Sequence, residues 1–392
     1  MPFNSNPKTV SIFGVTGSVG TSAQEVIMLN KDNFVVDTIV SNNNVKALIK
    51  AAILLNPKLV IIRNKEKFTE LEEALGKYNF ILLFGDDNIL ESSKRNVDIF
   101  VAAIIGYAGL ITTYSSVGNA KIIALANKES LVCAGPILLN KANNHNSNII
   151  PIDSEHNTLF QILSGYKSDN ISKMIITASG GPFRGYSIKS LNNVSPAEAT
   201  AHPVWDMGKK ISVDSATLMN KGLELIEAVY LFNISPEKIN IIVHPESIVH
   251  GIIEFDDGSM SAGLSTPNMR TPISYALNYP KKVNANVKPL NLTLIKSLNF
   301  EDVNEKIFRS VQVARDALQR GHSSVISLNA ANEIAVNAFL NKKINFLNII
   351  NIVERSVLKM ASLEINNIDD IIMVDQESRK ITYDLISRGN YK

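Results

Sequence analysis

Short apolar runs alternate with helical patterns over the first 150 residues of the chain. Apolar residues three or four positions apart mark helices such as Ser18–Leu29, and they separate runs rich in Val, Ile and Phe. These runs predict strands at Thr9–Phe13, Phe34–Val40, Leu59–Arg63, Asp98–Ala102 and Lys121–Leu125. Strands that alternate with helices are typical of a doubly wound parallel sheet. We therefore expect an α/β fold in which residues 1–150 form a Rossmann-like domain.

The pattern changes after residue 150. Glycine-rich loops, alternating strands such as Ile248–Phe255 and one strong helix after Asp214 predict an α+β domain over residues 151–280. Residues 281–304 carry proline, asparagine and lysine with little periodicity, which is typical of a linker.

The last part of the chain, residues 305–392, has a helical pattern. Phe308–Arg320 predicts a helix that ends at Gly321, and Leu328–Leu340 predicts the next helix. A chain of 392 residues is also longer than one hydrophobic core usually serves. We therefore expect a Rossmann-like α/β domain, an α+β domain, a linker and a C-terminal helical domain.

The composition is that of an ordinary globular protein, with 45% apolar and 19% charged residues. Lys and Arg number 39 against 37 Asp and Glu, so the formal charge is +2. Such a small charge gives no broad field that would recruit nucleic acid or a membrane, and we expect neither partner. An anionic substrate would have to be bound by local groups.

The single cysteine, Cys133, lies in the apolar run Ala124–Leu139, which predicts a buried structural thiol. A chain without a disulfide suits a reducing compartment. The first residues show neither an apolar signal segment nor an Arg-rich transit segment, and no apolar run is long enough to span a bilayer. We expect a cytoplasmic protein.

Gly14, Gly17 and Gly20 form a G-x-x-G-x-x-G motif between the first predicted strand and the first predicted helix. Glycines in this place allow a tight turn and a close approach to a pyrophosphate, which helix N-terminal amides then bind. The alternative is a tight strand-to-helix turn without a ligand. The placement between strand and helix favours a dinucleotide site.

The end of the second strand indicates which nicotinamide nucleotide would bind. An NAD site usually has a carboxylate there for the ribose hydroxyls, but this chain has Ser41 followed by three asparagines. Asp37 lies earlier, inside the strand, where it is not expected to reach the ribose. The missing acid favours NADPH.

Two segments carry carboxylates that could bind a cation. Asp153 and Glu155 follow an apolar strand and would share one face if the chain stays extended, although a solvated loop would look the same. Asn220, Lys221 and Glu224 have the i, i+3 and i+4 spacing of one helix face, in a helix that opens at Asp214 or Ser215. Alone, this second group would read as a surface ion pair.

Further polar residues lie in loops. Ser179 precedes two glycines, a pattern suited to wrapping backbone amides around an oxyanion, or else an ordinary flexible loop. Trp205, the only tryptophan, lies in a Gly- and Pro-rich loop, either as part of a lid or as a pin to the core. His244 and His250 lie on either side of the start of a predicted strand. Either could be a hydrogen-bonded structural residue, as most histidines are.

Taken together, eight segments resemble the 1-deoxy-D-xylulose 5-phosphate reductoisomerase family in order along nearly the whole chain. They are GVTGSVG (14–20), ANKESLVCAG (126–135), PIDSEH (151–156), ASGGPFR (178–184), HPVWDMGKKISVDSATLMNKGLE (202–224), HPESIVH (244–250), PNMRTP (267–272) and LNAANE (328–333). The resemblance implies a homodimer whose middle domain is catalytic and carries a mobile lid at about 180–210.

The resemblance also assigns residues. The implied metal ligands are Asp153, Glu155 and Glu224. The implied substrate contacts are Ser154, Ser179, His202, Trp205, Ser215, Asn220, Lys221 and His250. The implied nucleotide contacts are Gly14, Thr16, Gly17, Ser18, Val19, Gly20, Asn127, Lys128 and Glu129. Asn43 is a further candidate nucleotide contact, but family members often have a basic residue at this position. Lys46 is the nearest basic residue that could take its place.

The implied reaction converts 1-deoxy-D-xylulose 5-phosphate to 2-C-methyl-D-erythritol 4-phosphate for isoprenoid precursor biosynthesis. A retro-aldol cleavage and re-joining of the carbon skeleton precedes hydride transfer from NADPH. Three carboxylates suit Mg²⁺ or Mn²⁺, which would stabilise negative charge on the substrate oxygens. The implied catalytic residues are Lys128, Glu155, His202 and Lys221, with Lys128 and Glu155 as candidates for proton transfer.

Two other functions remain open at this point. A metal-independent, NADP-dependent dehydrogenase of the semialdehyde type shares the glycine motif, but it needs a nucleophilic cysteine in a polar loop. A non-catalytic NADPH-binding sensor could also use this fold. Sensitivity to chelators separates the first alternative from the family reaction, and turnover separates the second.

Overall fold

The structure is a computed structural model that describes residues 6–166, 170–205, 207–389 and 391. Residues 1–5 belong to the stretch in which no signal or transit segment was expected, and they lie outside the described residues. Asp206 of the predicted lid lies outside them as well. The chain divides into two compact units. Unit 1 comprises Met1–Ser130, Leu138–Asn157 and Asn268–Lys288, and unit 2 comprises Leu131–Ile137, Thr158–Pro267 and Pro289–Lys392.

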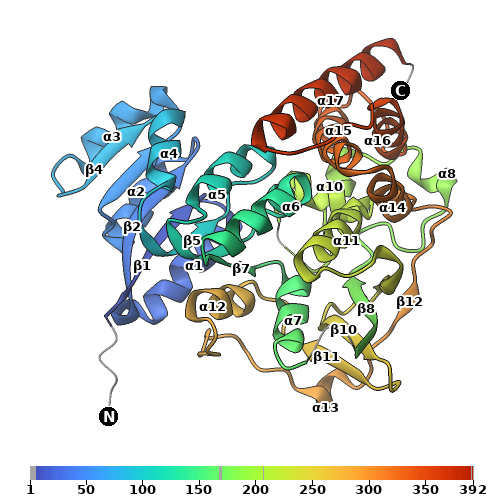
Figure 1. Cartoon of the computed structure of the whole chain (residues 1–392), viewed down its shortest axis with the longest axis horizontal. Coiled ribbons are helices and arrows are strands. Elements are labelled where there is room, and N and C mark those ends of the chain that lie inside the picture. Colours follow the sequence, from blue (N-terminus) through green and yellow to red (C-terminus); the bar gives the residue numbers. More distant parts are fainter. Residues whose placement is uncertain (1–5, 167–169, 206, 390, 392) are drawn as a thin grey trace. The chain divides into compact units, whose positions relative to one another are not determined.

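Unit 1 contains a seven-stranded parallel sheet in the order β4-β3-β2-β1-β5-β6-β7 (Figure 1). The strands are β1 (Lys8–Phe13), β2 (Phe34–Ser41), β3 (Leu59–Ile62), β4 (Ile81–Phe84), β5 (Val97–Ala102), β6 (Ala120–Leu125) and β7 (Asn148–Pro151). The order reverses between β1 and β5, which is the topological switch point where doubly wound sheets bind ligands. The predicted fold class is confirmed. The edge strand β4 was not predicted. Its sequence ILLF is apolar without alternation, and such a short run does not separate a strand from a helix.

The helices of unit 1 alternate with its strands along the chain, as the sequence pattern predicts. They are α1 (Ser18–Leu29), α2 (Val45–Leu55), α3 (Phe68–Leu75), α4 (Asp86–Ser93), α5 (Leu110–Ser116) and, from a later part of the chain, α12 (Arg270–Asn278). Two longer helices, α6 (Lys128–Asn144) and α7 (Ser154–Leu163), begin in unit 1. Strand β1 is buried on both sides from Val10 to Phe13, as central parallel strands are.

Unit 2 contains a five-stranded mixed sheet in the order β11-β10-β8-β9-β12. Its strands are β8 (Ile171–Ala178), β9 (Ile239–Val243), β10 (Val249–Phe255), β11 (Met260–Leu264) and β12 (Glu301–Asp302). Helix α11 (Met219–Phe232) packs on this sheet through a cluster that includes Leu225, Ala228 and Ile239. The α+β character predicted for the middle of the chain is present here.

Helices dominate the rest of unit 2. They are α8 (Ile188–Leu191), α9 (Pro196–Thr200), α10 (Lys209–Ala216), α13 (Leu292–Ile295), α14 (Ser310–Arg320), α15 (His322–Leu340), α16 (Asn348–Lys359) and α17 (Ile368–Arg388). In Figure 1 the long α17 lies beside α15 and α16, with which it packs. Helix α15 begins at His322 rather than at the predicted Leu328, because Gly321 (φ +108°) ends α14 and starts α15 at one residue.

A second correction concerns the helix predicted to open at Asp214 or Ser215. Both residues end α10, and α11 begins only at Met219. Leu218 separates the two helices with a left-handed backbone (φ +58°), a conformation that a branched side chain adopts at a cost of roughly 1 kcal/mol or more. No sequence signal marks this turn, since glycine or asparagine would be the expected residue there.

Buried charge in unit 1 is neutralised by an arginine. Asp37 on β2 is buried and accepts hydrogen bonds from Arg95 Nε at 2.6 Å and Nη2 at 2.8 Å. Burial alone would raise the pKa of Asp37, but the hydrogen bonds from Arg95 and Thr38 outweigh it and lower this pKa. Asp37 is therefore a structural residue of the sheet.

Within the part of the chain that the structure describes, no helix has both the length and the apolar character needed to cross a membrane.

Replacement of Arg95 tests the importance of its ion pair with Asp37. We expect Arg95→Met to lower the free energy of unfolding by about 3 kcal/mol, because it leaves a buried carboxylate without its main partner. The loss should shrink below pH 4, since the lowered pKa of Asp37 makes this contribution present above its unfolded pKa and lost as the pH falls through the folded one. Urea unfolding at pH 7 and at pH 3.5 measures both effects.

The matched control is Arg63→Met. Arg63 makes the same two-bonded contact with Asp86, but the two side chains are 49% and 69% exposed. We expect a loss of less than about 1 kcal/mol there. Equal losses for the two variants would contradict the role assigned to burial.

Candidate active site

The glycine motif forms the turn between β1 and α1. Gly14 has φ +97°, and a Cβ atom there would lie 2.3 Å from the carbonyl oxygen of Ala103. A Cβ atom on Gly20 would lie 2.3 Å from the carbonyl oxygen of Gly14. Both positions therefore require glycine for the turn itself, whether or not a ligand binds.

Gly17 is different, because the protein around it leaves room for a side chain. It has φ −80°, and a Cβ atom would meet only Gly14 O at an ordinary 3.5 Å. Gly17 is the N-cap of α1, whose first turn holds no acidic residue. The positive end of the helix dipole lies at Gly17, the one glycine of the motif that the turn itself does not require. This arrangement favours a bound anion over a turn without a ligand.

The corner after β2 lies beside this turn. Thr16 Oγ1 and Ser41 Oγ are 2.8 Å apart, and the amides of Gly14 and Val15 donate to Val40 O at 3.0 Å. Asn43 is exposed, as a residue that meets a nucleotide from solvent would be. Of the nucleotide residues predicted here, Ser18 and Val19 begin α1 beside Gly17.

Asn127 and Lys128 follow β6 at the same edge of the sheet. Asn127 is buried and caps α6, with its Oδ1 accepting from Ser130 N at 2.8 Å and its Nδ2 donating to Ile104 O at 2.6 Å. Lys128 is buried as well, and its ammonium donates to the carboxylate of Asp153. The predicted nucleotide segment is thus tied directly to a predicted metal ligand within unit 1.

Asp153 and Glu155 do not lie on an extended chain, as their spacing had suggested. Helix α7 begins at Ser154, so Asp153 precedes the helix and Glu155 lies in its first turn. Ser154 Oγ donates to Glu155 Oε2 at 2.5 Å. The helix wins over the strand here because Asp153 accepts the amide of Asn157 through its carbonyl at 2.8 Å, closing the first turn.

His156 was not predicted as a functional residue. It is fully buried, and its Nδ1 lies 3.5 Å from Asp153 Oδ1. The signal available in the sequence was its i, i+3 spacing from Asp153 at a helix start.

Ser179 follows β8 and contacts the predicted lid residue His202. Ser179 Oγ and His202 Nε2 are 2.9 Å apart, and Gly181 N donates to the same hydroxyl at 3.3 Å. His202 Nδ1 accepts from the amides of Val204 at 3.2 Å and Trp205 at 2.9 Å. An Nδ1 that accepts leaves the ring proton on Nε2, so a neutral His202 donates to Ser179.

Ser215 is brought to the same place by the paired glycines. A Cβ atom on Gly181 (φ +66°) would lie 2.8 Å from Ser215 O, so the loop packs directly on the end of α10. Asp214, the residue before it, is buried between Lys210 Nζ at 2.7 Å and Asn332 Nδ2 at 2.8 Å. These contacts fix the end of α10, and with it Ser215.

Asn220, Lys221 and Glu224 share one face of α11, as their spacing predicted. Lys221 Nζ donates to Glu224 Oε2 at 2.5 Å, and Asn220 Nδ2 donates to Glu224 Oε1. Unlike a surface pair, the Lys221 and Glu224 side chains are only 6% and 1% exposed. We refer to Asn220, Lys221 and Glu224 as the Glu224 cluster.

Two predicted substrate residues have weaker structural links to this group. His250 is buried on β10, where its Nε2 lies 2.9 Å from Ser265 Oγ. Trp205 is half-buried and meets the group through its amide on His202.

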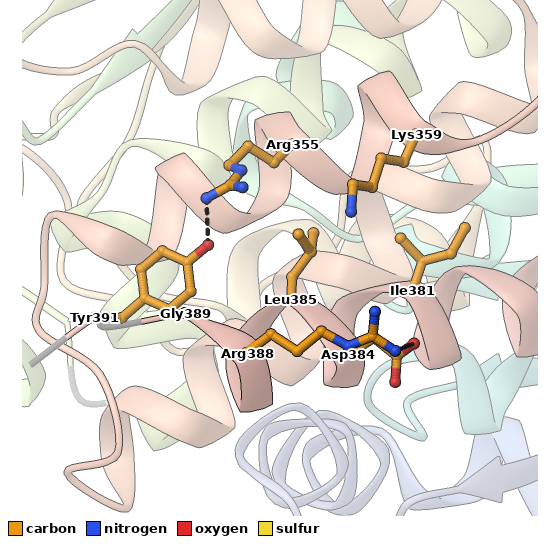
Figure 2. Close-up of a pocket in the computed structure, with 8 residues that line it drawn as sticks. All are labelled: Arg355, Lys359, Ile381, Asp384, Leu385, Arg388, Gly389 and Tyr391. Atoms are coloured by element: carbon orange, nitrogen blue, oxygen red, sulfur yellow. Dashed lines mark hydrogen bonds and ion pairs between the residues drawn. The ribbon is translucent and has the colours of Figure 1, made fainter.

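The described residues also form a cavity of about 330 Å³ elsewhere in unit 2, between α16 and α17 (Figure 2). Arg355 Nη1 donates to the hydroxyl of Tyr391 at 2.5 Å, and Arg388 pairs with Asp384 at 3.4 Å. The cavity has a single carboxylate and contains none of the predicted site residues. Its contacts anchor Tyr391 to α16 and do not provide a cation site.

Three family models match the chain in order. Residues 10–135 match 1-deoxy-D-xylulose 5-phosphate reductoisomerase, residues 149–232 match the 1-deoxy-D-xylulose 5-phosphate reductoisomerase C-terminal domain, and residues 264–381 match the DXP reductoisomerase C-terminal domain. A relative from Thermoanaerobacter sp. (strain X514), named 1-deoxy-D-xylulose 5-phosphate reductoisomerase, is 45% identical over 374 residues. The match covers 95% of this chain and 98% of the relative.

Solved structures are similar over the same length. The structure of 1-deoxy-D-xylulose 5-phosphate reductoisomerase from Zymomonas mobilis in complex with NADPH has a TM-score of 0.90 at 39% identity, covering 98% of this chain and 100% of that one. A structure of DOX-P reductoisomerase in complex with NADPH, fosmidomycin and magnesium has a TM-score of 0.90 at 37% identity with the same coverage.

The protonation of His202 gives a test of the geometry in unit 2. Burial, and after it the positive charge of Lys221, lowers the pKa of His202 to about 4. We expect NMR titration of labelled histidines to show His202 neutral down to about pH 4, and Lys221→Met to raise this pKa only in part, because burial is the larger cause. A pKa near 6.5 in the unchanged protein would contradict the burial of His202 beside Lys221. Because the folded pKa is the lower one, the associated stability is present above pH 6.5 and is lost as the pH falls toward 4.

Proposed function

Because the chain belongs to the 1-deoxy-D-xylulose 5-phosphate reductoisomerase family, we propose that it converts 1-deoxy-D-xylulose 5-phosphate to 2-C-methyl-D-erythritol 4-phosphate with NADPH and Mg²⁺ or Mn²⁺. The observation that carries this proposal is the group of polar side chains held at short range in unit 2. Ser179 contacts His202, and the glycine loop that follows Ser179 packs on Ser215. The positive charge of Lys221 contributes to the lowered pKa of His202. A dehydrogenase for an uncharged substrate needs no such group.

Asp153, Glu155 and Glu224 are the residues that would hold the metal ion. Their oxygen donors fit a hard divalent cation, and the burial of Glu224 favours a carboxylate that is neutralised by a cation. The bound ion supplies Lewis acidity that stabilises negative charge on the substrate oxygens during the skeletal rearrangement. Asp153 is held beside Lys128, which places an ammonium next to that charge and makes Lys128, with Glu155, a candidate for proton transfer.

The phosphate of the substrate is assigned to Ser179, Ser215, Asn220 and Lys221, with Ser154 and His250 as further contacts. Lys221 supplies the positive charge, while the hydroxyls and the amide supply hydrogen bonds with defined directions. A neutral His202 donates from Nε2, so it binds an oxygen atom without adding charge. Trp205 is placed beside His202, where its ring would exclude water from the hydride transfer.

NADPH is assigned to the edge of the sheet in unit 1. The turn Gly14–Gly20 would bind the pyrophosphate through the α1 N-terminus, and Asn127, Lys128 and Glu129 would approach from the end of β6. Asn43, exposed after β2, would meet the 2′-phosphate by hydrogen bonding alone. The remaining parts of the proposal, a homodimer in the cytoplasm, rest on the family resemblance and on the single cysteine.

The semialdehyde dehydrogenase alternative is not favoured. It requires an accessible nucleophilic thiol, whereas Cys133 is fully buried inside α6. A sensor that binds NADPH without turnover would have no use for the Glu224 cluster.

The decisive assay follows NADPH oxidation in the presence of 1-deoxy-D-xylulose 5-phosphate and Mg²⁺ or Mn²⁺. We expect turnover that a chelator abolishes, and a loss of more than about 100-fold in kcat/KM for Glu224→Gln, which removes a proposed metal ligand. Glu254→Gln serves as the matched control, because Glu254 lies on β10 in the same unit and contacts Lys173 at 3.7 Å. Turnover that survives the chelator, or an equal loss in the two variants, would sink the proposed function.

A further inference from the structure

The corner after β2, where the proposed NADPH site meets the 2′-phosphate, has no positive charge of its own. Ser41 ends β2 and the next three residues are asparagines, so residues 41–44 are all neutral. The 2′-phosphate that distinguishes NADPH from NADH carries close to two negative charges, as other phosphate monoesters do at neutral pH. Charge-assisted hydrogen bonds bind such a group most strongly. We therefore looked for a cation that reaches this corner from another element.

The backbone after β3 runs directly beside this corner. Strand β3 pairs with β2 in parallel, and Ile62 lies opposite Ser41. Past the ends of the two strands, Arg63 N donates to Ser41 O at 2.8 Å. Asn64 N donates to Asn42 O in the same way at 3.0 Å. Because neighbouring strands lie about 4.8 Å apart, Arg63 starts one strand spacing from the end of β2. It lies at the carboxyl edge, where doubly wound sheets bind ligands.

The guanidinium of Arg63 is held at this edge in a geometry that also suits phosphate. Its Nε and Nη2 donate to the two carboxylate oxygens of Asp86 at 2.6 and 3.1 Å. Asp86 is the first residue of α4 and follows Gly85, whose amide donates to Ile62 O at 3.1 Å. The ion pair therefore lies at the same edge of the sheet as the end of β2. A fork that matches two carboxylate oxygens also matches two oxygens of a phosphate.

Exposure makes the contact between Arg63 and Asp86 easy to exchange. The two side chains are 49% and 69% exposed, so water solvates Asp86 when the guanidinium leaves it. A phosphate offers more negative charge than a carboxylate and again accepts two aligned hydrogen bonds. The buried pair of Arg95 with Asp37 is the contrast, because the Asp37 side chain is only 7% exposed and would lose its partner without gaining water.

We propose that Arg63 selects NADPH over NADH by exchanging Asp86 for the 2′-phosphate of the nucleotide. The proposal rests on the proposed function, which assigns NADPH to this edge of unit 1. It adds that the positive charge comes from the end of β3 and not from the segment after β2. Asn43 then contributes hydrogen bonds, while Arg63 contributes the charge.

Two lysines near the corner provide a rival and a control. Lys46 lies in the first turn of α2 and is the rival source of charge. Lys65 follows Arg63 by two residues, and its ammonium lies 5.7 Å from the centre of the Phe84 ring. Both lysines are exposed, and each has one compact ammonium in place of a two-bonded fork. Loss of either charge is therefore expected to weaken NADPH binding only slightly.

Isothermal titration calorimetry on the full chain, with NADPH and NADH as probes and without sugar phosphate, tests the selection. We expect the unchanged protein to prefer NADPH by about 10-fold or more, the effect of hydrogen bonds to a charged group. Arg63→Met should remove most of this preference by weakening NADPH, with NADH nearly unchanged. Arg63→Lys should keep part of it, because the charge remains and the fork is lost. Lys65→Met should keep nearly all of it.

Replacement of Asp86 tests the exchange. Asp86→Asn removes the competing carboxylate, so NADPH should bind more tightly by about 2- to 5-fold, the range that an exposed ion pair allows. The same change in the Arg63→Met background should have a smaller effect, because no guanidinium is left to release. NADH should respond little in either background. Circular dichroism verifies that every variant folds.

Four results would overturn the selection by Arg63 while leaving the proposed function intact. They are equal affinities of the unchanged protein for NADPH and NADH, an unchanged preference in Arg63→Met, equal losses of both nucleotides in that variant, and an equally large loss of preference in Lys46→Met or Lys65→Met. Equal losses of both nucleotides would show that Arg63 contacts a part that they share, such as the adenine ring.

Two further outcomes have separate meanings. No gain from Asp86→Asn, or an equal gain with and without Arg63, would overturn the exchange with Asp86. Failure of the unchanged protein to bind NADPH at all would instead count against the proposed function itself.

Discussion

The ion pair between Lys221 and Glu224 is the contact on which the chemistry of unit 2 depends. It lies on α11, a helix whose residues Leu223, Leu225 and Ile226 are fully buried in the same stretch as the two charges. A helix embedded on nearly all sides positions its side chains rigidly, but it also removes every charge on it from water. The pairing of Lys221 with Glu224 offsets part of the cost of burying these two charges. The site is thus precise because the helix is buried, and the ion pair makes that burial tolerable.

Tight backbone turns around α11 bring the other polar groups to this pair. Leu218 adopts a left-handed conformation between α10 and α11, and Ser310 Oγ donates to the carbonyl of the preceding Thr217 at 2.5 Å. Gly181 allows the loop after β8 to touch Ser215. The strain at Leu218 is maintained by the packing of a buried side chain, which is how irregular backbone persists near functional groups. Core packing and site geometry are therefore one structure in this unit.

Local patterns predicted what local forces determine. The strands of unit 1 follow from short apolar runs, and the setting of Gly14–Gly20 follows from the change between a strand pattern and a helix pattern. The shared face of the Glu224 cluster follows from the three- and four-residue spacing of a helix. The pattern did not reveal contacts between distant segments, such as Lys128 with Asp153 or Ser179 with His202. The local sequence of one segment contains no signal that identifies the other. It also misplaced the start of α11 and treated Asp153 to Glu155 as extended. In both cases a tertiary constraint overrode the residue preference, through packing at Leu218 and through closure of the first turn of α7.

The buried ion pair of Asp37 contains an arginine, whereas those of Asp153 and Glu224 contain lysines. Asp37 is held by Arg95 through two nitrogens in a fixed planar fork, which suits a permanent contact in the sheet. Asp153 and Glu224 are held by lysines, each through a single compact ammonium on a flexible stem. A point charge on a flexible chain can move to another anion with little loss of geometry, whereas a guanidinium fork gives up two aligned hydrogen bonds. Lysine therefore neutralises these carboxylates through one charged group, whereas arginine at the same positions would hold them through two aligned hydrogen bonds.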